Sequence, residues 1–374
     1  MEAQNLPDAL KMIMNEKGWN QARLSKEMGV LTTWVSKVIE GQRDTPVRNA
    51  AELLGRVGYE LVIRRKSDEA EVKRRAFLAN VATVTLVPSA DGNPYRDPEY
   101  VSLLADRVGK SLHGSGGLTT LEDATRQLRR VQSVIVGSKD RRLLSAASSL
   151  AEQVSGVHYD ARDLPQARKA GKLAAAFAQL ADDREQQARA FNDLSVFYCY
   201  ESDGARGERY ARLALATPGI SPMWEAQASV SLGRALGLLH EKRHSSIVLD
   251  RVRQIAAELT DIQRAKLTGN VGVALHEQGD WKAAQETLNE AVKGISASSP
   301  LRGANYLARQ VQAAFKASEP FLAIDLMHSL VRIAPLVSSA RLDGYLSEIM
   351  TLSHPWKGTP AVRDMREQLR ILLT

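Results

Sequence analysis

Apolar residues in the first 66 positions recur at intervals of three and four, a spacing that predicts four short helices rather than strands. Gly29, Gly41 and Gly58 follow successive apolar segments at points where a glycine can end a helix. Residues 59–64 then alternate and are rich in β-forming side chains, which is typical of a short strand. The pattern therefore predicts a small helical domain over residues 1–66 that ends in one strand.

The pattern from residue 119 onward is helical throughout and contains an internal repeat. Segments that begin at Ala188, Ala226 and Ala265 carry small and apolar residues at matching positions, with starts 38 and 39 residues apart. Each segment predicts a helix, a turn and a returning helix. A two-helix unit cannot bury its own apolar face, so successive units should stack into a curved superhelix with a concave surface. We therefore expect a helical repeat domain over residues 119–374.

Residues 67–118 differ from both flanking regions. Residues 69–86 are compatible with one more helix, after which prolines and glycines interrupt the chain. The run from His113 to Gly117 contains three glycines and predicts a flexible loop. These residues are therefore expected to form a linker that contains some helix.

Composition agrees with an all-α protein that has no membrane segment. Hydrophobic residues make up 44% of the 374 residues and aromatic residues only 5%, which favours helix over sheet. No apolar run reaches the roughly 18 residues that a membrane-spanning helix needs. The single cysteine, Cys199, excludes an internal disulfide and a thiolate metal cluster, and we expect it to be a small buried hydrophobe in a cytoplasmic protein. The net charge of +7 permits a nucleic-acid partner without demonstrating one.

The segment from Trp19 to Gly41 has the spacing of two short helices joined by a tight turn at Gly29. It resembles the lambda-repressor-like (XRE-type) helix-turn-helix family. The matching residues are Trp19-Asn20-Gln21, Leu24-Ser25, Met28-Gly29-Val30-Leu31-Thr32-Thr33, Val35-Ser36, Val38-Ile39 and Gly41. The resemblance implies that the second of these helices enters the major groove of DNA.

The apolar positions of this segment form a shared core, which leaves a polar face on the second helix. The outward residues are Thr32, Thr33, Ser36 and Lys37. By the same resemblance, Gln21 contacts a phosphate and Arg43 contacts the DNA backbone. Trp34 is large for a recognition helix, and it either packs under the helix or contacts a thymine methyl group or a sugar.

Small residues and a turn punctuate the repeat that begins at Ala265. Gly272, the Gly279-Asp280 turn, Ala284 and Ala291 resemble the consensus of the tetratricopeptide repeat. The period is nearer 39 residues than the family's roughly 34, and the family's tryptophan is absent. The resemblance implies a tetratricopeptide-like superhelix whose first helices line the concave surface.

Polar residues recur in the first helices of the repeats and mark a candidate ligand groove. Asn192 and Asn270 can both donate to and accept from a peptide backbone, and Arg234 and Arg309 can bind a carboxylate. The residues that accompany them are Arg189, Lys266 and Asn305. The alternative is that these side chains are solvated or form hydrogen bonds between packed helices.

Two further motifs resemble enzyme sites but lack the necessary context. The residues from His240 to His244 spell H-E-x-x-H, which binds zinc only when both histidines share one helix face, yet they fall at an expected turn between repeat helices. Gly109-Lys110-Ser111 matches the end of a phosphate-binding loop, but Leu104 stands where the first glycine belongs. We therefore expect no catalytic residue, no metal, no cofactor and no enzymatic activity.

A DNA-reading head followed by tetratricopeptide-like repeats resembles the peptide-sensing transcription regulators of bacteria and similar regulators of actinomycetes. The resemblance implies sequence-specific binding to double-stranded DNA, with a small signal, a peptide or a protein bound by the repeats. A repeat-based protein-binding adaptor and an antitoxin-like protein are alternatives. We expect a homodimer, because the strand at 59–64 has no obvious partner in its own domain. Either it pairs with a second subunit or the repeats supply the dimer contact.

Overall fold

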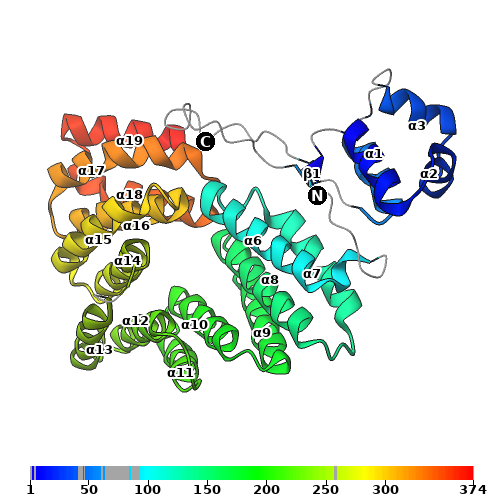
Figure 1. Ribbon diagram of the computed structural model, residues 1–374. Coiled ribbons are helices and arrows are strands. Elements are labelled where there is room, and N and C mark those ends of the chain that lie inside the picture. The colour runs from blue at the N-terminus through cyan, green and yellow to red at the C-terminus, as the bar shows by residue number, and fades with distance from the viewer. Residues whose placement is uncertain are drawn as a thin grey trace. The chain divides into compact units, whose positions relative to one another are not determined.

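A computed structural model describes residues 2–3, 6–40, 45, 47–59, 62–63, 84–85, 93–256 and 259–373 (Figure 1). The chain divides into two compact units, Met1–Tyr100 and Val101–Thr374, each with its own buried apolar residues. The second unit thus begins inside the stretch that the sequence pattern predicts to be a linker, at residue 101 rather than at residue 119.

The first unit is built on α1 (Leu6–Lys17), α2 (Gln21–Met28), α3 (Thr32–Ile39) and α4 (Val47–Arg56). The Asn20 side chain accepts a hydrogen bond from the Arg23 N–H at 2.9 Å and so begins α2. Gly29 ends the same helix in the left-handed conformation, with φ at +71°. The buried apolar side chains between these helices include Leu10, Ile13, Leu24, Met28, Val35, Val38 and Leu54. The four helices predicted from the apolar spacing are confirmed.

Three two-residue strands form a small antiparallel sheet in the first unit: β1 (Glu2–Ala3), β2 (Val62–Ile63) and β3 (Val84–Thr85). Their order is β1-β3-β2, with Val62 opposite Thr85. The strand predicted at 59–64 therefore has a partner in its own chain, and the inference of dimerisation from an unpaired strand loses its premise. At Val84–Thr85 the expected helix over 69–86 is also wrong, and the other residues of that range lie outside the described residues.

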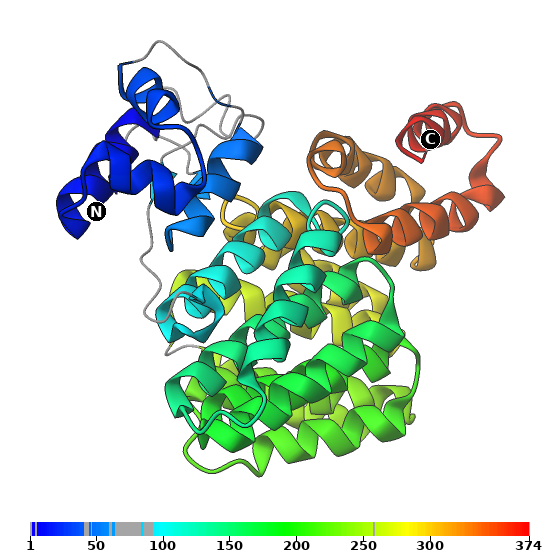
Figure 2. The ribbon, with the colours of Figure 1, turned by 90° about the vertical axis from the view of Figure 1, so that its right-hand side faces the viewer.

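The second unit is a tetratricopeptide-like superhelix of antiparallel helix pairs that follow one another round a curve (Figures 1 and 2). Its described helices are α6 (Pro98–Ser115), which starts at the end of the first unit, α7 (Leu121–Ile135), α8 (Arg141–Asp160), α9 (Leu164–Ala181), α10 (Arg184–Tyr200), α11 (Gly204–Leu215), α12 (Pro222–Leu238), α13 (Lys242–Ala256), α14 (Asp261–Glu277), α15 (Trp281–Ile295), α16 (Pro300–Lys316), α17 (Pro320–Ile333), α18 (Ala340–Leu352) and α19 (Pro360–Leu372). The segments beginning at Ala188, Ala226 and Ala265 lie on α10, α12 and α14, so the predicted helix pairs are confirmed. Among the described residues, no helix is both long enough and apolar enough to cross a membrane.

A recurring turn joins the helices of several pairs. An aspartate side chain accepts a hydrogen bond from a backbone N–H in the first turn of the returning helix, at Asp163, Asp203 and Asp280. The preceding residues adopt the left-handed conformation, and they are Arg162, Ser202 and Gly279. Only one of them is a glycine, although a side chain costs roughly 1 kcal/mol in this conformation. The aspartate cap is therefore the feature that these turns share in the sequence.

Contacts of Asp160 close the superhelix by joining its early helices to α18, which is followed by only one further described α-helix. Asp160 lies at the end of α8 and is only 1% exposed. Its carboxylate accepts hydrogen bonds from the Gly117 N–H and the Ser339 hydroxyl, each at 2.8 Å. The guanidinium of Arg341, near the start of α18, lies 3.3 Å from the same carboxylate. One buried charge thus joins the α6–α7 connection, α8 and α18.

Contacts with Ser338 also hold the segment from His113 to Gly117 in a defined conformation. Helix α6 continues through Ser115, whose carbonyl oxygen accepts from the Ser338 N–H at 2.7 Å. At Gly116, φ is +92° and a Cβ atom would lie 2.2 Å from the Ser338 carbonyl oxygen. The predicted flexible loop is therefore wrong, because glycine here permits a close approach of two backbones rather than flexibility.

Replacing Asp160 with alanine is expected to destabilise the second unit by about 3–5 kcal/mol, because Arg341 would remain buried without its counter-charge. The free energy of unfolding from denaturant titrations measures the effect. The matched control is Asp250→Ala on α13, where the aspartate is 65% exposed and pairs with Arg253. Its expected effect is within about 0.5 kcal/mol. Equal free energies of unfolding for the two variants would contradict the stabilising role of the Asp160 contacts.

Candidate ligand pocket

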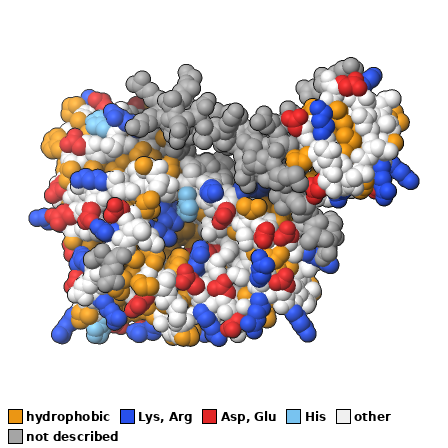
Figure 3. Space-filling model, in the orientation of Figure 1, with side chains coloured by type: hydrophobic (Ala, Val, Ile, Leu, Met, Phe, Trp, Pro, Cys, Tyr) orange, Lys and Arg blue, Asp and Glu red, His pale blue; other side chains and the backbone are white. Residues whose placement is uncertain are grey.

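The inner helices of the second unit surround a pocket of about 280 Å³, lined by residues of α6, α8, α10, α12, α14, α16 and α18. Figure 3 shows a hollow near the middle of this unit, with Lys and Arg side chains beside it. The lining cations are Arg189, Arg234, Lys266, Arg302, Arg309 and Arg341, and the lining carboxylates are Glu152, Asp160 and Asp193. Cations outnumber carboxylates, so the pocket is polar and electropositive.

All four residues predicted to bind a ligand line this pocket. Asn192, Arg234, Asn270 and Arg309 lie on α10, α12, α14 and α16, the successive first helices of the repeats. The repeat register in the sequence thus placed them on one surface, although their role toward a ligand stays a prediction.

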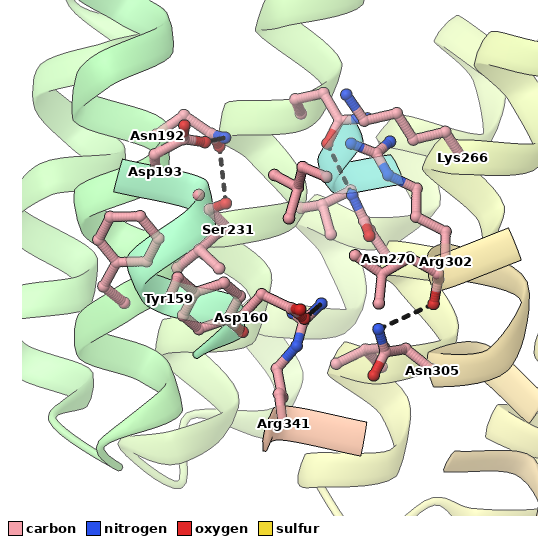
Figure 4. A pocket seen from close by; sticks show the side chains of 18 of the residues that line it. Tyr159, Asp160, Asn192, Asp193, Ser231, Lys266, Asn270, Arg302, Asn305 and Arg341 are labelled. Atoms are coloured by element: carbon pink, nitrogen blue, oxygen red, sulfur yellow. Dashed lines mark hydrogen bonds and ion pairs between the residues drawn. The ribbon is translucent and has the colours of Figure 1, made fainter. Parts of the chain in front are cut away.

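The two asparagines also link neighbouring repeats. The Oδ1 atom of Asn192 accepts from the Ser231 hydroxyl at 2.8 Å (Figure 4). The Nδ2 group of Asn270 donates to Gln227 Oε1, and its Oδ1 atom accepts from the Tyr306 hydroxyl, both at 2.8 Å. Hydrogen bonding between packed helices, the alternative left open by the sequence, therefore holds for both side chains.

The two arginines share the carboxylate of Glu277 at the end of α14. Arg234 is bidentate, with Nε 2.5 Å and Nη2 2.7 Å from the two oxygens. Burial acts to lower the pKa of Arg234, but Glu277 keeps it well above its usual value. Arg309 lies 3.6 Å from Glu277 and stacks 4.2 Å from the Tyr345 ring centroid. Both charges are thus already compensated within the protein.

Two other cations in the pocket are poorly compensated. Arg302 donates to Nε2 of His113 at 3.2 Å, and Lys266 lies 5.2 Å from the ring centroid of Trp224. Burial and the charge of Arg302 lower the pKa of Lys266 to about 7. Burial also lowers the pKa of Arg302, and the charge of Arg341 acts in the same direction.

The candidate set from the sequence omits Arg302, and it gives Lys266 only a secondary place. Their signal was present, because Arg302, Asn305 and Arg309 follow a spacing of three and four along α16 and share one helix face. The candidate set also omits Asp193, which follows Asn192 in the sequence. Burial and the charge of Glu152 raise the pKa of Asp193 to about 7, so the pocket has an acidic side as well.

The predicted DNA-contacting residues lie in the first unit. Thr32, Thr33 and Lys37 are exposed on α3, whereas Ser36 is half-buried and donates to Glu40 at 2.9 Å. Gln21 is the half-buried first residue of α2, and Arg43 lies outside the described residues. The Thr32 hydroxyl lies 3.0 Å from that of Ser25 on α2. Trp34 is half-buried against the core of this unit, in agreement with packing under the helix.

The motifs that resemble enzyme sites have structural positions of their own. His240 is a turn residue with φ at +64°, and α13 begins only at Lys242, so the two histidines of H-E-x-x-H do not share a helix. Gly109-Lys110-Ser111 lies inside α6. Cys199 is 2% exposed on α10, and burial raises the pKa of its thiol to about 11, which opposes reactivity.

Fold and pocket together define the class of the second unit: a tetratricopeptide-like repeat protein with an electropositive pocket inside its superhelix. No protein-family model and no curated protein matches the chain. Among solved structures, the chain is similar to a Rap protein complexed with competence and sporulation factor, with a TM-score of 0.49 and 10% identity over 98% of each chain. It is also similar to BtubC from P. vanneervenii, with a TM-score of 0.41 and 14% identity over 59% of this chain and 91% of the other. A third similar structure is the apo form of RapI, with a TM-score of 0.34 and 13% identity over 93% and 97% of the two chains.

Asn192→Ala and Asn270→Ala are each expected to cost about 1–3 kcal/mol of stability, because each removes a hydrogen bond between neighbouring repeats. Asn192→Ala leaves the buried Ser231 hydroxyl without its acceptor. Asn270→Ala leaves Gln227 Oε1 without its donor, whereas the Tyr306 hydroxyl still reaches the Lys266 carbonyl oxygen at 3.1 Å. Denaturant titration measures both effects, with exposed Asn289→Ala on α15 as the control. If both variants are as stable as the wild type, the two asparagines do not stabilise the fold, and a role in ligand binding alone would be favoured.

Acid should destabilise the second unit partly through His113. Burial, together with the charges of Arg302, Lys266 and Arg341, lowers the pKa of His113 to about 3. Between pH 6.5 and 3 the unfolded chain therefore binds a proton that the folded chain does not, and stability falls as the pH decreases, by up to about 1.4 kcal/mol per pH unit. His113→Asn should reduce this slope. Exposed His328→Asn on α17 should leave it unchanged, and identical slopes in the two variants would contradict the assignment.

Proposed function

We propose that the chain is a cytoplasmic, homodimeric transcription regulator that binds double-stranded DNA through its first unit and a small signal, a peptide or a protein through its second. The observation that carries the proposal is the presence, on one chain, of two short helices joined by a turn at Gly29, with exposed polar residues on the second helix, and a repeat superhelix with a polar pocket.

The DNA-binding half of the proposal rests on α2, the turn at Gly29 and α3. Thr32, Thr33 and Lys37 are exposed, so base contacts would need no rearrangement of the core. Leu31, immediately before α3, is 76% exposed, and an apolar side chain there suits a thymine methyl group. Gln21 at the start of α2 suits a phosphate, because the N–H groups of a helix start favour an anion.

The signal-binding half rests on the pocket, and α6 offers a route for its effect. α6 carries His113 to the pocket, where Arg302 donates to its imidazole. A ligand that displaces or strengthens this contact would act on the last turn of α6. A change in DNA binding further requires that the ligand binds one geometry of the chain better than another.

A repeat-based adaptor is the second candidate function. One observation favours it: outside the pocket, Phe321 on α17 is 69% exposed and lines a shallow surface with Leu322 and Trp356. Exposed aromatic and aliphatic side chains of this kind suit a protein partner.

The triple variant Thr32→Ala, Thr33→Ala, Lys37→Ala should lose DNA affinity by about 1–3 kcal/mol for each good base contact removed. Sites are first selected by the full chain from a pool of random duplexes. Titrations then compare the variant with Lys282→Ala, which removes an exposed lysine of α15. Light scattering on the protein–DNA complex reports whether two chains bind half-sites about 34 Å apart.

Failure of the wild-type chain to enrich any duplex would reject the regulator in favour of the adaptor. So would equal DNA binding by the triple variant, provided that circular dichroism shows it folded.

A further inference from the structure

Two of the six cations in the pocket lack a carboxylate partner. Arg189 pairs with Glu152, and Arg341 with Asp160, at 2.8 and 3.3 Å. Arg234 and Arg309 share Glu277. Among the described residues, no carboxylate oxygen lies within 4.0 Å of the side-chain nitrogens of Lys266 or Arg302. Figure 4 shows these two side chains extending toward the same part of the pocket.

This arrangement does not stabilise the folded chain. Taking a cation out of water is unfavourable unless an opposite charge compensates it, and a second cation nearby adds repulsion. Burial and Arg302 shift the pKa of Lys266 downward, although the charges of Asp193 and Glu152 act in the opposite direction. Charges that are perturbed in this way and lack a direct ion pair in a cavity are typical of functional sites rather than of structural ion pairs.

Amide groups with free hydrogen-bonding capacity line the same pocket. Asn305 is 6% exposed and lies one helical turn after Arg302; its Oδ1 atom has no hydrogen-bond partner. Gln227 is 3% exposed, and its Nε2 atom likewise has none. Buried polar atoms are nearly always satisfied, so one free acceptor and one free donor in a cavity favour a ligand that supplies both. A peptide group is such a ligand, since it carries one N–H and one C=O.

We propose that Lys266 and Arg302 bind the carboxylate of a short peptide, with Asn305 and Gln227 hydrogen-bonded to its peptide groups. Arg302 can form two parallel hydrogen bonds to a carboxylate, and Lys266 can complete its coordination. A single negative charge fits better than a phosphate dianion, because Glu152 and Asp193 line the same pocket. This inference rests on the proposed signal-binding function and specifies the chemistry of the signal.

Paired peptide pools supply the test. The full chain is incubated with pentapeptides of random sequence that lack Asp and Glu and carry either a free carboxyl terminus or a terminal amide. A third, amidated pool contains one Asp. Peptides retained by the protein are counted by mass spectrometry. We expect at least tenfold greater retention of carboxylate-bearing peptides. Preference for the first pool identifies a terminal carboxylate, and preference for the third identifies a side-chain carboxylate.

Variants connect retention to the two cations. Lys266→Met and Arg302→Met should each reduce retention at least tenfold, while Lys282→Met, on the exposed face of α15, should retain peptides as the wild type does. Because Lys266→Met also removes buried repulsion, its melting temperature without peptide should exceed that of the wild type. An unchanged or lower value would count against the proposal, and this readout does not depend on finding the right peptide.

The outcomes separate this inference from the proposed function. Equal retention of the free-acid and amidated pools, or unchanged retention by both methionine variants, would overturn the carboxylate anchor while leaving a peptide-binding regulator intact. Retention of no pool would overturn both the anchor and a peptide signal. DNA binding by the first unit is measured separately and would stand in either case.

Discussion

The Asp160 carboxylate joins three segments that are far apart in the chain: the connection after α6, the end of α8 and the start of α18. An open stack of helix pairs presents a concave surface to solvent. In this chain the contacts of Asp160 instead bring α18 beside the ends of α6 and α8, and all three helices line one pocket. Arg341 belongs both to the closure and to the pocket lining. The shape of the pocket and the integrity of the superhelix therefore depend on the same buried ion pair.

The polar residues of the pocket fall into two groups, according to whether they have partners within the protein. Arg234 and Arg309 are held by Glu277, and Asn192 and Asn270 are held by neighbouring repeats. These residues link neighbouring helices and have little hydrogen-bonding or charge capacity left for a ligand. Lys266 and Arg302 form no direct ion pair with a carboxylate among the described residues, although the charges of Asp193 and Glu152 act on both. Burying such a pair costs stability, and this cost is one ground for the proposal that the pair binds a ligand.

Helix α6 carries His113 to the pocket and packs within the second unit. Its last turn is fixed from two sides, by Ser338 at Ser115 and by Arg302 at His113. A change at Arg302 thus acts on the last turn of α6. Because His113 stays neutral over the physiological range, the contact with Arg302 does not switch with small changes in pH.

Elements whose causes are local can be predicted from the sequence alone. Apolar spacing and Gly29 predict the helices of the first unit. The repeat copies predict the register that brings four polar residues into one pocket: Asn192, Arg234, Asn270 and Arg309. Features that need partners distant in the chain could be known only from the folded structure. Strand β2, after α4, pairs with residues 84–85. Gly116 and Gly117 pack against Ser338 and Asp160. Glu277 neutralises Arg234 and Arg309, two of the four residues predicted to bind a ligand. Whether a side chain is free for a ligand depends on which charges the fold places beside it, and periodicity along one helix carries no information about the charges on the next.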